Sequence, residues 1–200
     1  MTDLATIRKQ LRNIRRGLSR RERDIAARQA AERASRLRQF LNADRIALYR
    51  GVDGELCPLP LVETALSLGK TVCLPVLHPF IGGRLVFCRW QPGEAMRRNR
   101  FGIEEPIPTA RNIIRPSHLD LVVMPLLGFD AHCHRIGMGG GFYDRTFAFK
   151  QQRRFLKSPY LLGFAHERQR LQQIEQRPWD VPLDAVVTNA ALHYRRPLTR

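Results

Sequence analysis

The sequence predicts an α/β protein in which helices flank a mostly parallel, twisted sheet. Three observations support this fold class. Short apolar runs typical of strands alternate along the chain with segments of helical periodicity. Hydrophobic residues make up 44% of the 200 residues, which is enough for one core of ordinary size. Internal repeats and linker-like stretches are missing from the sequence, so we expect residues 1–200 to form a single domain.

Two helices are predicted at the start of the chain. The first covers the basic segment 7–16. Ser19, followed three residues later by Glu22, is a capping-box pattern and predicts the start of the second helix. Apolar residues then recur at helical spacing and form a stripe that should pack on the sheet. This stripe consists of Ile25, Ala30, Ala34, Leu37 and Leu41.

A strand, a helix and a second strand follow. The apolar run 45–50 predicts the first strand, and a glycine-containing turn comes after it. A helix is expected over 59–68, because Pro60 suits its first turn and Gly69 its C-terminal end. The second predicted strand covers 70–76.

The middle of the chain begins with a predicted turn at Gly82 and Gly83, which leads into a strand over 84–90. Residues 91–117 are rich in Pro, Gly and Arg, so we expect them to form mostly loop. The next apolar run, 121–125, predicts another strand.

The remaining elements complete the alternation. A helix is expected to begin near Gly140 and another to cover 168–176, with strands over 160–165 and 184–188. This order favours Rossmann-like layers preceded by a basic N-terminal helix. In such sheets ligands gather at the carboxyl ends of the strands.

The formal net charge of +16 predicts attraction to polyanions, either nucleic acid or small substrates that carry phosphates and carboxylates. Much of the excess charge lies in the first 45 residues. This stretch has no interleaved aromatic residues and no RNA-binding signature, so nucleic acid is the less favoured partner.

Membrane-length apolar runs and a signal-peptide pattern are also missing, and we expect a cytoplasmic protein with no membrane partner. The cysteines show no CxxC spacing and should stay unbridged in a reducing compartment. They are Cys57, Cys73, Cys88 and Cys133. No apolar stripe requires a second copy of the chain, so a monomer is expected.

The segment 134–145 carries the clearest signal for function. Between Arg135 and Arg145 it holds four glycines, Gly137, Gly139, Gly140 and Gly141. Glycine allows backbone amides to approach an anion because no Cβ stands in the way. Such amides, placed where a helix begins and beside two arginines, predict a phosphate-binding loop. The carboxylate of Asp144 can hold the magnesium that accompanies ATP. A flexible surface loop is the alternative.

Several blocks of the sequence together resemble the 5-formyltetrahydrofolate cyclo-ligase family. The segment Gly128-Phe-Asp130, followed by Arg135-Ile-Gly-Met-Gly-Gly-Gly-Phe-Tyr-Asp-Arg145, is similar to the family signature. The other matching blocks occur in the family's order. They are 47–49 with 53–55, 70–75, 102–106, 179–180 and 184–188. The similarity extends from the basic first helix to Thr188 and favours the bacterial branch.

The resemblance implies a ligase that converts 5-formyltetrahydrofolate, with or without a polyglutamate tail, to 5,10-methenyltetrahydrofolate, with release of ADP and phosphate. ATP would phosphorylate the formyl oxygen, and the 10-nitrogen would then displace the phosphate and close the ring. It implies Mg²⁺ as the cofactor, held by Asp144 and Asp180.

The resemblance also implies the binding residues. Those for ATP are Arg8, Arg12, Arg135, Ile136, Gly137, Met138, Gly139, Gly140, Gly141, Phe142 and Tyr143. Those for the folate are Arg50, Glu55, Met138, Gly139, Gly140, Gly141 and Phe142.

Three positions depart from the family pattern. Cys133 replaces a usual glycine two residues before Arg135, Cys57-Pro58 replaces an Asp-Thr pair, and Phe142 replaces a tyrosine. A shifted Arg135 would be costly in a positioned site. The alternative function is therefore a catalytically weakened relative that acts as a basic folate- or nucleic-acid-binding protein. The trio 132–134, His-Cys-His, is a poor zinc site because three consecutive loop residues rarely converge on one ion.

Overall fold

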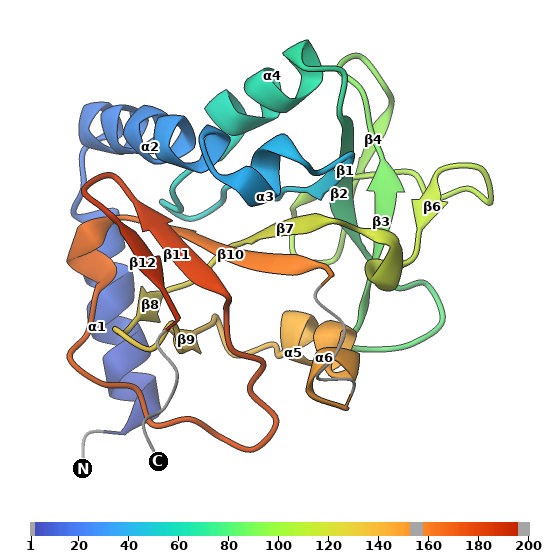
Figure 1. Cartoon of the computed structure of the whole chain (residues 1–200). Helices are drawn as coiled ribbons and strands as arrows, with labels where there is room; N and C mark the ends of the chain where they lie inside the picture. Colours follow the sequence, from blue (N-terminus) through green and yellow to red (C-terminus); the bar gives the residue numbers. More distant parts are fainter. Residues whose placement is uncertain (1–2, 153–157, 196–200) are drawn as a thin grey trace.

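The apolar strand segments predicted from the sequence assemble into one central sheet, because their side chains alternate between two faces that must both be covered. The computed structural model describes residues 3–152 and 158–195, and in these residues eight strands form this sheet (Figure 1). In spatial order they are β12 (Leu192–Tyr194), β11 (Ala185–Thr188), β10 (Tyr160–Ala165), β7 (Leu121–Met124), β1 (Arg45–Ala47), β2 (Thr71–Leu77), β3 (Leu85–Arg89) and β6 (Ile113–Ile114).

The sheet is mostly parallel. The five neighbouring strands from β11 to β2 run parallel to one another, and β12, β3 and β6 pair antiparallel at the two sides. The predicted α/β class with a mostly parallel sheet is therefore confirmed. The predicted bounds of β10 agree with the structure, whereas β1 is shorter than the predicted strand 45–50.

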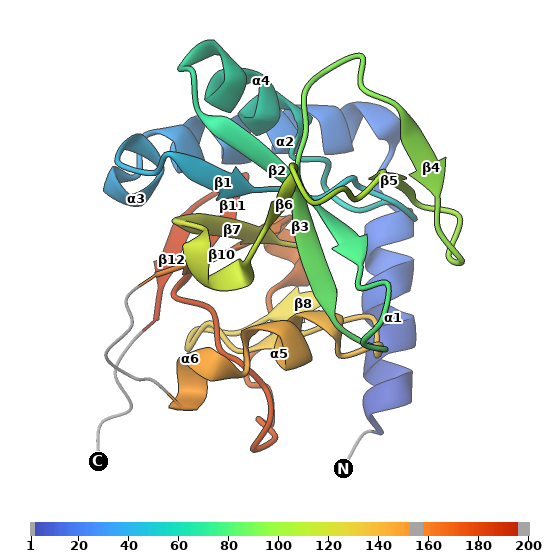
Figure 2. The ribbon, with the colours of Figure 1, turned by 90° about the vertical axis from the view of Figure 1, so that its right-hand side faces the viewer.

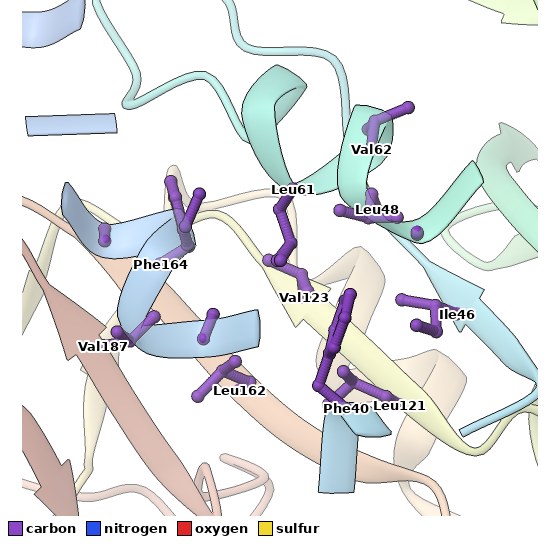
Figure 3. Close-up of a cluster of buried hydrophobic side chains, with 14 of the residues drawn as sticks. Phe40, Ile46, Leu48, Leu61, Val62, Leu121, Val123, Leu162, Phe164 and Val187 are labelled. Carbon is purple, nitrogen blue, oxygen red and sulfur yellow. The ribbon is translucent and has the colours of Figure 1, made fainter. Parts of the chain in front are cut away.

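Three helices cover one face of the sheet: α2 (Arg20–Ser35), α3 (Arg38–Leu41) and α4 (Leu59–Ser67) (Figure 1). The predicted capping box begins α2, since the Ser19 hydroxyl accepts from the Glu22 N–H at 3.2 Å and the Glu22 carboxylate accepts from the Ser19 N–H at 2.7 Å. Figure 3 shows the core beneath these helices, where Phe40 and Leu61 point onto residues of β7.

The predicted apolar stripe of this region is wrong in part. Ala30, Ala34 and Leu37 are buried, but Ile25 and Leu41 are 47% and 55% exposed. Ile25 lies within α2 but beside the buried side of the helix rather than on it. Leu41 is exposed because the prediction assumed one continuous helix, whereas α2 ends at Ser35 and the chain turns before α3. Small side chains make up the buried side of α2: Ala26, Ala27, Ala30, Ala31 and Ala34.

The opposite face is covered by α5 (Phe142–Phe147), α6 (Phe149–Gln152) and a hairpin of β8 (Gly128–Phe129) and β9 (Arg135–Ile136) (Figures 1 and 2). Helix α1 (Leu4–Arg16) lies beside this hairpin in both views. Leu11 of α1 is buried there, against Gly128 among other residues, and a Cβ on that glycine would meet the Leu11 side chain at 2.7 Å. The close approach of α1 thus requires a glycine in β8.

The segment 91–117 is less irregular than predicted. It contains the antiparallel pair β4 (Met96–Arg98) and β5 (Glu104–Pro106), the edge strand β6, and the short 3-10 helix η1 (Pro116–His118). Its remaining residues form turns and loops, as expected. The β4–β5 pairing was not visible in the sequence because each strand has only three residues and little apolar periodicity.

The predicted helix 168–176 is wrong. Only the 3-10 helix η2 (Glu167–Gln169) forms there. The buried Gln169 amide donates to the carbonyls of Leu126 and Leu127, both at 3.0 Å, and the Leu171 N–H donates to the Phe129 carbonyl at 2.7 Å. Because these partners lie on the β7–β8 connection and β8, the segment is held extended against the sheet rather than coiled on itself.

All four cysteines lie in the described residues and are free thiols, as predicted. None of the helices in the part of the chain that the structure describes is both long and apolar enough to cross a membrane.

Candidate functional site

The candidate site lies where three parallel strands end. Arg145 joins the glycine-rich segment to the turn between β2 and β3, and helix α1 contacts both that segment and the turn after β1. The glycine loop consists of residues 137–141. It does not follow β7 directly, because the β8–β9 hairpin comes between them. Gly139 has φ +105° and Gly141 has φ +61°, which are conformations that glycine adopts without strain. Gly141 is also the residue at which α5 begins.

Helix α1 brings Arg8 onto the glycine loop. The Arg8 Nε donates to the Gly137 carbonyl at 3.1 Å, and the guanidinium lies over Gly139, 3.6 Å from where a Cβ would stand. Arg8, predicted to bind ATP, is therefore beside the predicted phosphate loop. Arg12 is not: its Nε lies 4.0 Å from the carboxylate of Asp53, on the turn after β1.

Arg145 holds the other side of the loop. It donates to the Gly140 carbonyl and, at 2.8 Å, to the Gly83 carbonyl of the β2–β3 turn. A Cβ at Gly141 would stand 2.8 Å from the Arg145 guanidinium, so this side chain can close over the loop only because the residue is glycine. The glycine loop is thus bounded by an arginine from α1 and an arginine from α5.

Arg135 and Asp144, predicted to bind the triphosphate and magnesium, pair with each other. The Arg135 side chain is only 6% exposed, and its guanidinium donates to the Asp144 carboxylate at 2.6 Å and to the Val181 carbonyl. Asp144 also accepts from the Val181 N–H at 3.1 Å. The sequence predicted that Arg135 would reach toward the loop. In the structure its guanidinium instead joins α5 to the 180–181 segment.

Asp180 lies next to this junction. Its carboxylate accepts from the Arg177 N–H at 2.9 Å, and its carbonyl accepts from the Gln151 amide at 2.7 Å. The two predicted magnesium ligands therefore belong to segments that touch. Within residues 3–152 and 158–195, however, the protein alone does not gather three or more His, Cys, Asp or Glu side chains around one point.

Glu55 lies on a turn held by α1. The buried Arg15 donates to the Asp53 carboxylate at 2.9 Å and to the Glu55 carboxylate at 3.4 Å, and Glu55 also accepts from the Val52 N–H at 3.1 Å. Asp53 has φ +51°, which marks a tight turn. The sequence analysis missed Arg15, which nothing distinguishes from the other arginines of α1. The Asp-Gly pair at 53–54 was a signal for the tight turn.

The charges at this turn change the pKa values of its groups. Burial raises the pKa of Glu55 against the opposing effects of the Val52 N–H and Arg15. Burial, followed by the charge of Glu55, raises the pKa of the Tyr143 phenol. For Asp53 burial acts in the same direction, but the guanidinium groups of Arg16 and Arg15 outweigh it and lower the pKa. Glu55 is thus close enough to act on the first turn of α5, at the end of the glycine loop.

A cavity of about 410 Å³ opens beside the glycine loop. Its walls are residues 77–84 of the β2–β3 turn, residues 97–100 with Glu105 of the β4–β5 hairpin, and Phe142 of α5. The arginines along these walls make it basic: Arg84, Arg97, Arg98 and Arg100. A second hollow of about 440 Å³ lies against α1 and is lined by Ile7, Gln10, Leu171, Gln172 and Gln173.

Of the other residues predicted to bind the folate, Phe142 lines the first cavity. Arg50 pairs with Glu104 of β5 at 2.7 Å, one residue from the buried Glu105 of the cavity wall. Glu104 and Glu105 therefore point in different directions. Phe142 packs edge-on against Phe101, with ring centroids 5.7 Å apart. Met138, in the glycine loop, is 45% exposed.

Cys133 has a left-handed conformation, with φ +60°, at the position where a glycine was expected. Its side chain is fully buried. The buried Asp130 carboxylate holds the turn around it by accepting from the N–H groups of His132 and His134, at 2.9 and 3.0 Å. The cysteine therefore follows the backbone path that a glycine would take, and the turn leading to Arg135 keeps its shape.

Comparisons with known proteins agree with this geometry. A model described as the 5-formyltetrahydrofolate cyclo-ligase family matches residues 1–189. The 5-formyltetrahydrofolate cyclo-ligase of Escherichia coli (strain K12) is 38% identical over 178 residues, which cover 89% of this chain and 96% of that protein. The 5-formyltetrahydrofolate cyclo-ligase of Haemophilus influenzae is 37% identical over 177 residues, covering 88% of this chain and 92% of that protein.

The fold is similar to that of a solved structure, the 5,10-methenyltetrahydrofolate synthetase of Aquifex aeolicus. The TM-score is 0.80 at 25% identity, and the match covers 98% of this chain and 95% of that one. The order of sequence blocks, the sheet with its glycine loop, and these relatives lead to the same assignment. The chain belongs to the 5-formyltetrahydrofolate cyclo-ligase family.

Proposed function

We propose that the protein is an ATP-dependent 5-formyltetrahydrofolate cyclo-ligase, which forms 5,10-methenyltetrahydrofolate, ADP and phosphate. One observation carries the proposal beyond family membership: the glycine loop is bounded by Arg8 and Arg145 and lies beside a basic cavity of about 410 Å³. A loop of this kind suits a phosphate chain, and the cavity has the size of a small-molecule site.

The reaction is phosphoryl transfer followed by ring closure. The formyl oxygen attacks the γ-phosphorus of ATP, and the bond from that phosphorus to the bridging oxygen of ADP breaks. The 10-nitrogen then attacks the activated formyl carbon and loses its proton, and the carbon–oxygen bond breaks, so that phosphate leaves with the former formyl oxygen. Such chemistry asks the protein mainly to align two substrates and to neutralise charge.

The nucleotide phosphates would lie on the glycine loop, with Arg8 and Arg145 on either side. Their guanidinium groups already contact the loop carbonyls of Gly137 and Gly140, so little rearrangement is needed to place positive charge at the phosphates. The base would occupy the hollow against α1, where Ile7 and Leu171 offer apolar surface and neighbouring glutamines offer hydrogen-bonding amides.

The acidic residues near the loop fit a divalent cation that arrives with the nucleotide. Asp144 and Asp180 supply hard carboxylate oxygens from two touching segments, and phosphate oxygens and water would provide the other ligands that Mg²⁺ requires. When bound, Mg²⁺ neutralises charge on the phosphate chain. The predicted cofactor role of these two aspartates stays a prediction.

The folate would occupy the basic cavity. Phe142 forms part of both the glycine loop's helix and the cavity wall, so the formyl group and the terminal phosphate can meet beside it. Glu55 would bind the adjacent N–H donors of the pterin ring, since a carboxylate matches a pair of parallel donors. Arg98 and Arg100 on the cavity wall place positive charge where the glutamate carboxylates of a folate can bind.

Product formation tests the proposal directly. The purified protein is given 5-formyltetrahydrofolate, ATP and Mg²⁺, and the ultraviolet absorbance of the methenyl product is followed together with phosphate release. We expect one phosphate per product and no product without ATP. Binding of the folate with no product under any of these conditions would instead support the alternative of a binding protein that has lost turnover.

A pair of glycine variants tests the loop. Gly139→Ala places a Cβ at φ +105° beside Arg8, whereas Gly93→Ala imposes a similar strain at φ +89° with no atom within 4 Å and outside the residues that line the cavity. We expect Gly139→Ala to lower kcat/KM for ATP about 10- to 100-fold, because a small displacement is costly in a positioned site. Gly93→Ala should keep normal kinetics. Equal kinetics in both variants would contradict the placement of ATP on this loop.

Cys133 has a left-handed backbone conformation that glycine adopts without strain, so its presence is a weak argument for the binding-protein alternative. The cytoplasmic location and the monomeric state stay predictions.

A further inference from the structure

Arg15 is an unusual residue in this fold. It is only 1% exposed, and it ranks among the largest fully buried side chains of the described residues. Arginine is seldom buried unless it is paired, and a buried ion pair often contributes little net stability because both charges lose their water. The Arg15 Nε is buried as well and has no hydrogen-bond partner within residues 3–152 and 158–195. Stability alone is therefore a poor account of this side chain.

The two terminal nitrogens of Arg15 join a pair of carboxylates on the turn after β1. Nη2 lies 2.9 Å from the Asp53 carboxylate and Nη1 lies 3.4 Å from Oε1 of Glu55. The other oxygen of Glu55, Oε2, accepts from the Val52 N–H at 3.1 Å. Because different partners hold its two oxygens, the Glu55 carboxylate has a defined orientation.

A nearby cation favours the charged form of Glu55 against the effect of its burial. Its side chain is only 7% exposed, and burial raises its pKa. The titratable and charged groups that face it are Arg15 from α1, Tyr143 from α5, and Asp53 and Tyr49 from its own segment. Of these groups only Arg15 is positively charged.

We propose that Arg15 is a positioning residue for folate binding: it keeps the Glu55 carboxylate ionised and correctly oriented, and Asp53 in turn orients Arg15. This inference rests on the proposed function, in which Glu55 binds the pterin ring. A neutral or rotated Glu55 would lose the paired hydrogen bonds to the pterin donors.

The neighbouring arginines of α1 do not share this role. Arg16 lies 2.6 Å from Asp53, but its side chain is 58% exposed. Arg12 is 4.0 Å from Asp53 and 32% exposed. Both lie beside the carboxylate of Asp53, and neither forms an ion pair or hydrogen bond with Glu55 within the described part of the chain. Arg16 is therefore a matched control, since it has the same residue type, the same helix and one of the same partners.

The test measures the Kd of 5-formyltetrahydrofolate by calorimetry without ATP, so it does not depend on turnover. Arg15→Gln should weaken folate binding about tenfold or more, the effect expected from losing a charged hydrogen-bond partner of a buried carboxylate. Arg15→Lys should recover part of the loss. Arg16→Gln should bind the folate within about twofold of the wild type, and nucleotide binding should be unchanged in all three variants.

A double-mutant cycle with Glu55→Gln identifies the route of the effect. If Arg15 acts through Glu55, adding Arg15→Gln to Glu55→Gln should cause little further loss. In the wild type and Arg15→Lys, the acid side of the kcat/KM profile for the folate should lie at lower pH than in Arg15→Gln, because a positive charge beside Glu55 favours the charged carboxylate.

Three results would overturn the inference. The first is unchanged folate affinity in Arg15→Gln or, if that variant does not fold, in Arg15→Lys. The second is an equal loss in Arg16→Gln. The third is a full additional loss when Arg15→Gln is added to Glu55→Gln. Failure of the proposed function has a different signature, since the wild type itself would then form no methenyl product.

Discussion

Replacing Cys133 separately by alanine and by glycine isolates the effect of its left-handed backbone. At an ordinary buried position, an Ala-to-Gly change costs about 1.5 kcal/mol, from greater freedom of the unfolded chain and loss of a buried methyl group. At Cys133, where φ is +60°, glycine also removes a conformational penalty of about 1–2 kcal/mol that alanine retains. We therefore expect Cys133→Gly and Cys133→Ala to agree within about 0.5 kcal/mol.

Urea denaturation under reducing conditions measures both variants, and Ala165→Gly provides the control. Ala165 in β10 is fully buried and is not among the residues with positive φ, so this exchange should cost the full amount of about 1.5 kcal/mol. Cys133→Gly should also keep the activity of the wild type, because the turn before Arg135 is unchanged. The reasoning is refuted if Cys133→Gly is less stable than Cys133→Ala by as much as the control exchange costs.

Three further outcomes follow from the buried charges. Asp144→Asn should lower turnover at least about 100-fold. It should also lower the free energy of unfolding by about 1–3 kcal/mol, since Arg135, 6% exposed, loses its charged partner. Kinetics and urea denaturation measure the two effects, and unchanged turnover would remove Asp144 from the site. Glu105→Ala should lower the free energy of unfolding by about 3–4 kcal/mol, because this carboxylate is 2% exposed and accepts from an arginine, an asparagine and a backbone N–H. Glu104→Ala, at the exposed neighbour, should lower it by less than about 1 kcal/mol. Similar losses in both variants, measured by urea denaturation, would contradict the assigned burial. Burial acts to raise the pKa of Glu167, but hydrogen bonds from a threonine hydroxyl and a histidine ring lower this pKa below its usual 4.5. The stabilising contribution of Glu167 is therefore present above pH 4.5 and is lost as the pH falls through the lowered pKa of the folded state. Glu167→Gln should therefore flatten the pH dependence of the unfolding free energy in that window, and an unaltered slope would refute this assignment.

Local patterns predicted the elements whose own residues determine them. The capping box at Ser19, the helix 59–68 with Pro60 and Gly69, and the apolar strand 160–165 all appear within a residue or two of their predicted bounds. The missed elements depend on distant partners. The hairpin β8–β9 has two residues in each strand, and the segment 168–176 is held extended by bonds to residues 126–130, which a helical pattern in the sequence does not reveal.

The candidate site was predicted to a different extent. The glycine loop was recognisable because close approach requires glycine, and Arg8 does lie beside it. The Arg135–Asp144 pair was not foreseen, since each residue was assigned separately to a ligand and their mutual contact depends on how α5 packs against β9. Arg15 was missed for a similar reason: only the docked helix distinguishes its buried side chain from the exposed arginines around it.

Helix α1 is synthesised well before the surface that it packs on. Arg8 contacts Gly137, 129 positions further along the chain, and Leu11 packs with Leu127, Ile136 and Ile174. During translation this helix must leave the ribosome with its apolar side unburied and wait for most of the chain to follow. A product truncated before residue 127 would lack this surface and keep that side of the helix exposed, open to chaperones and proteases.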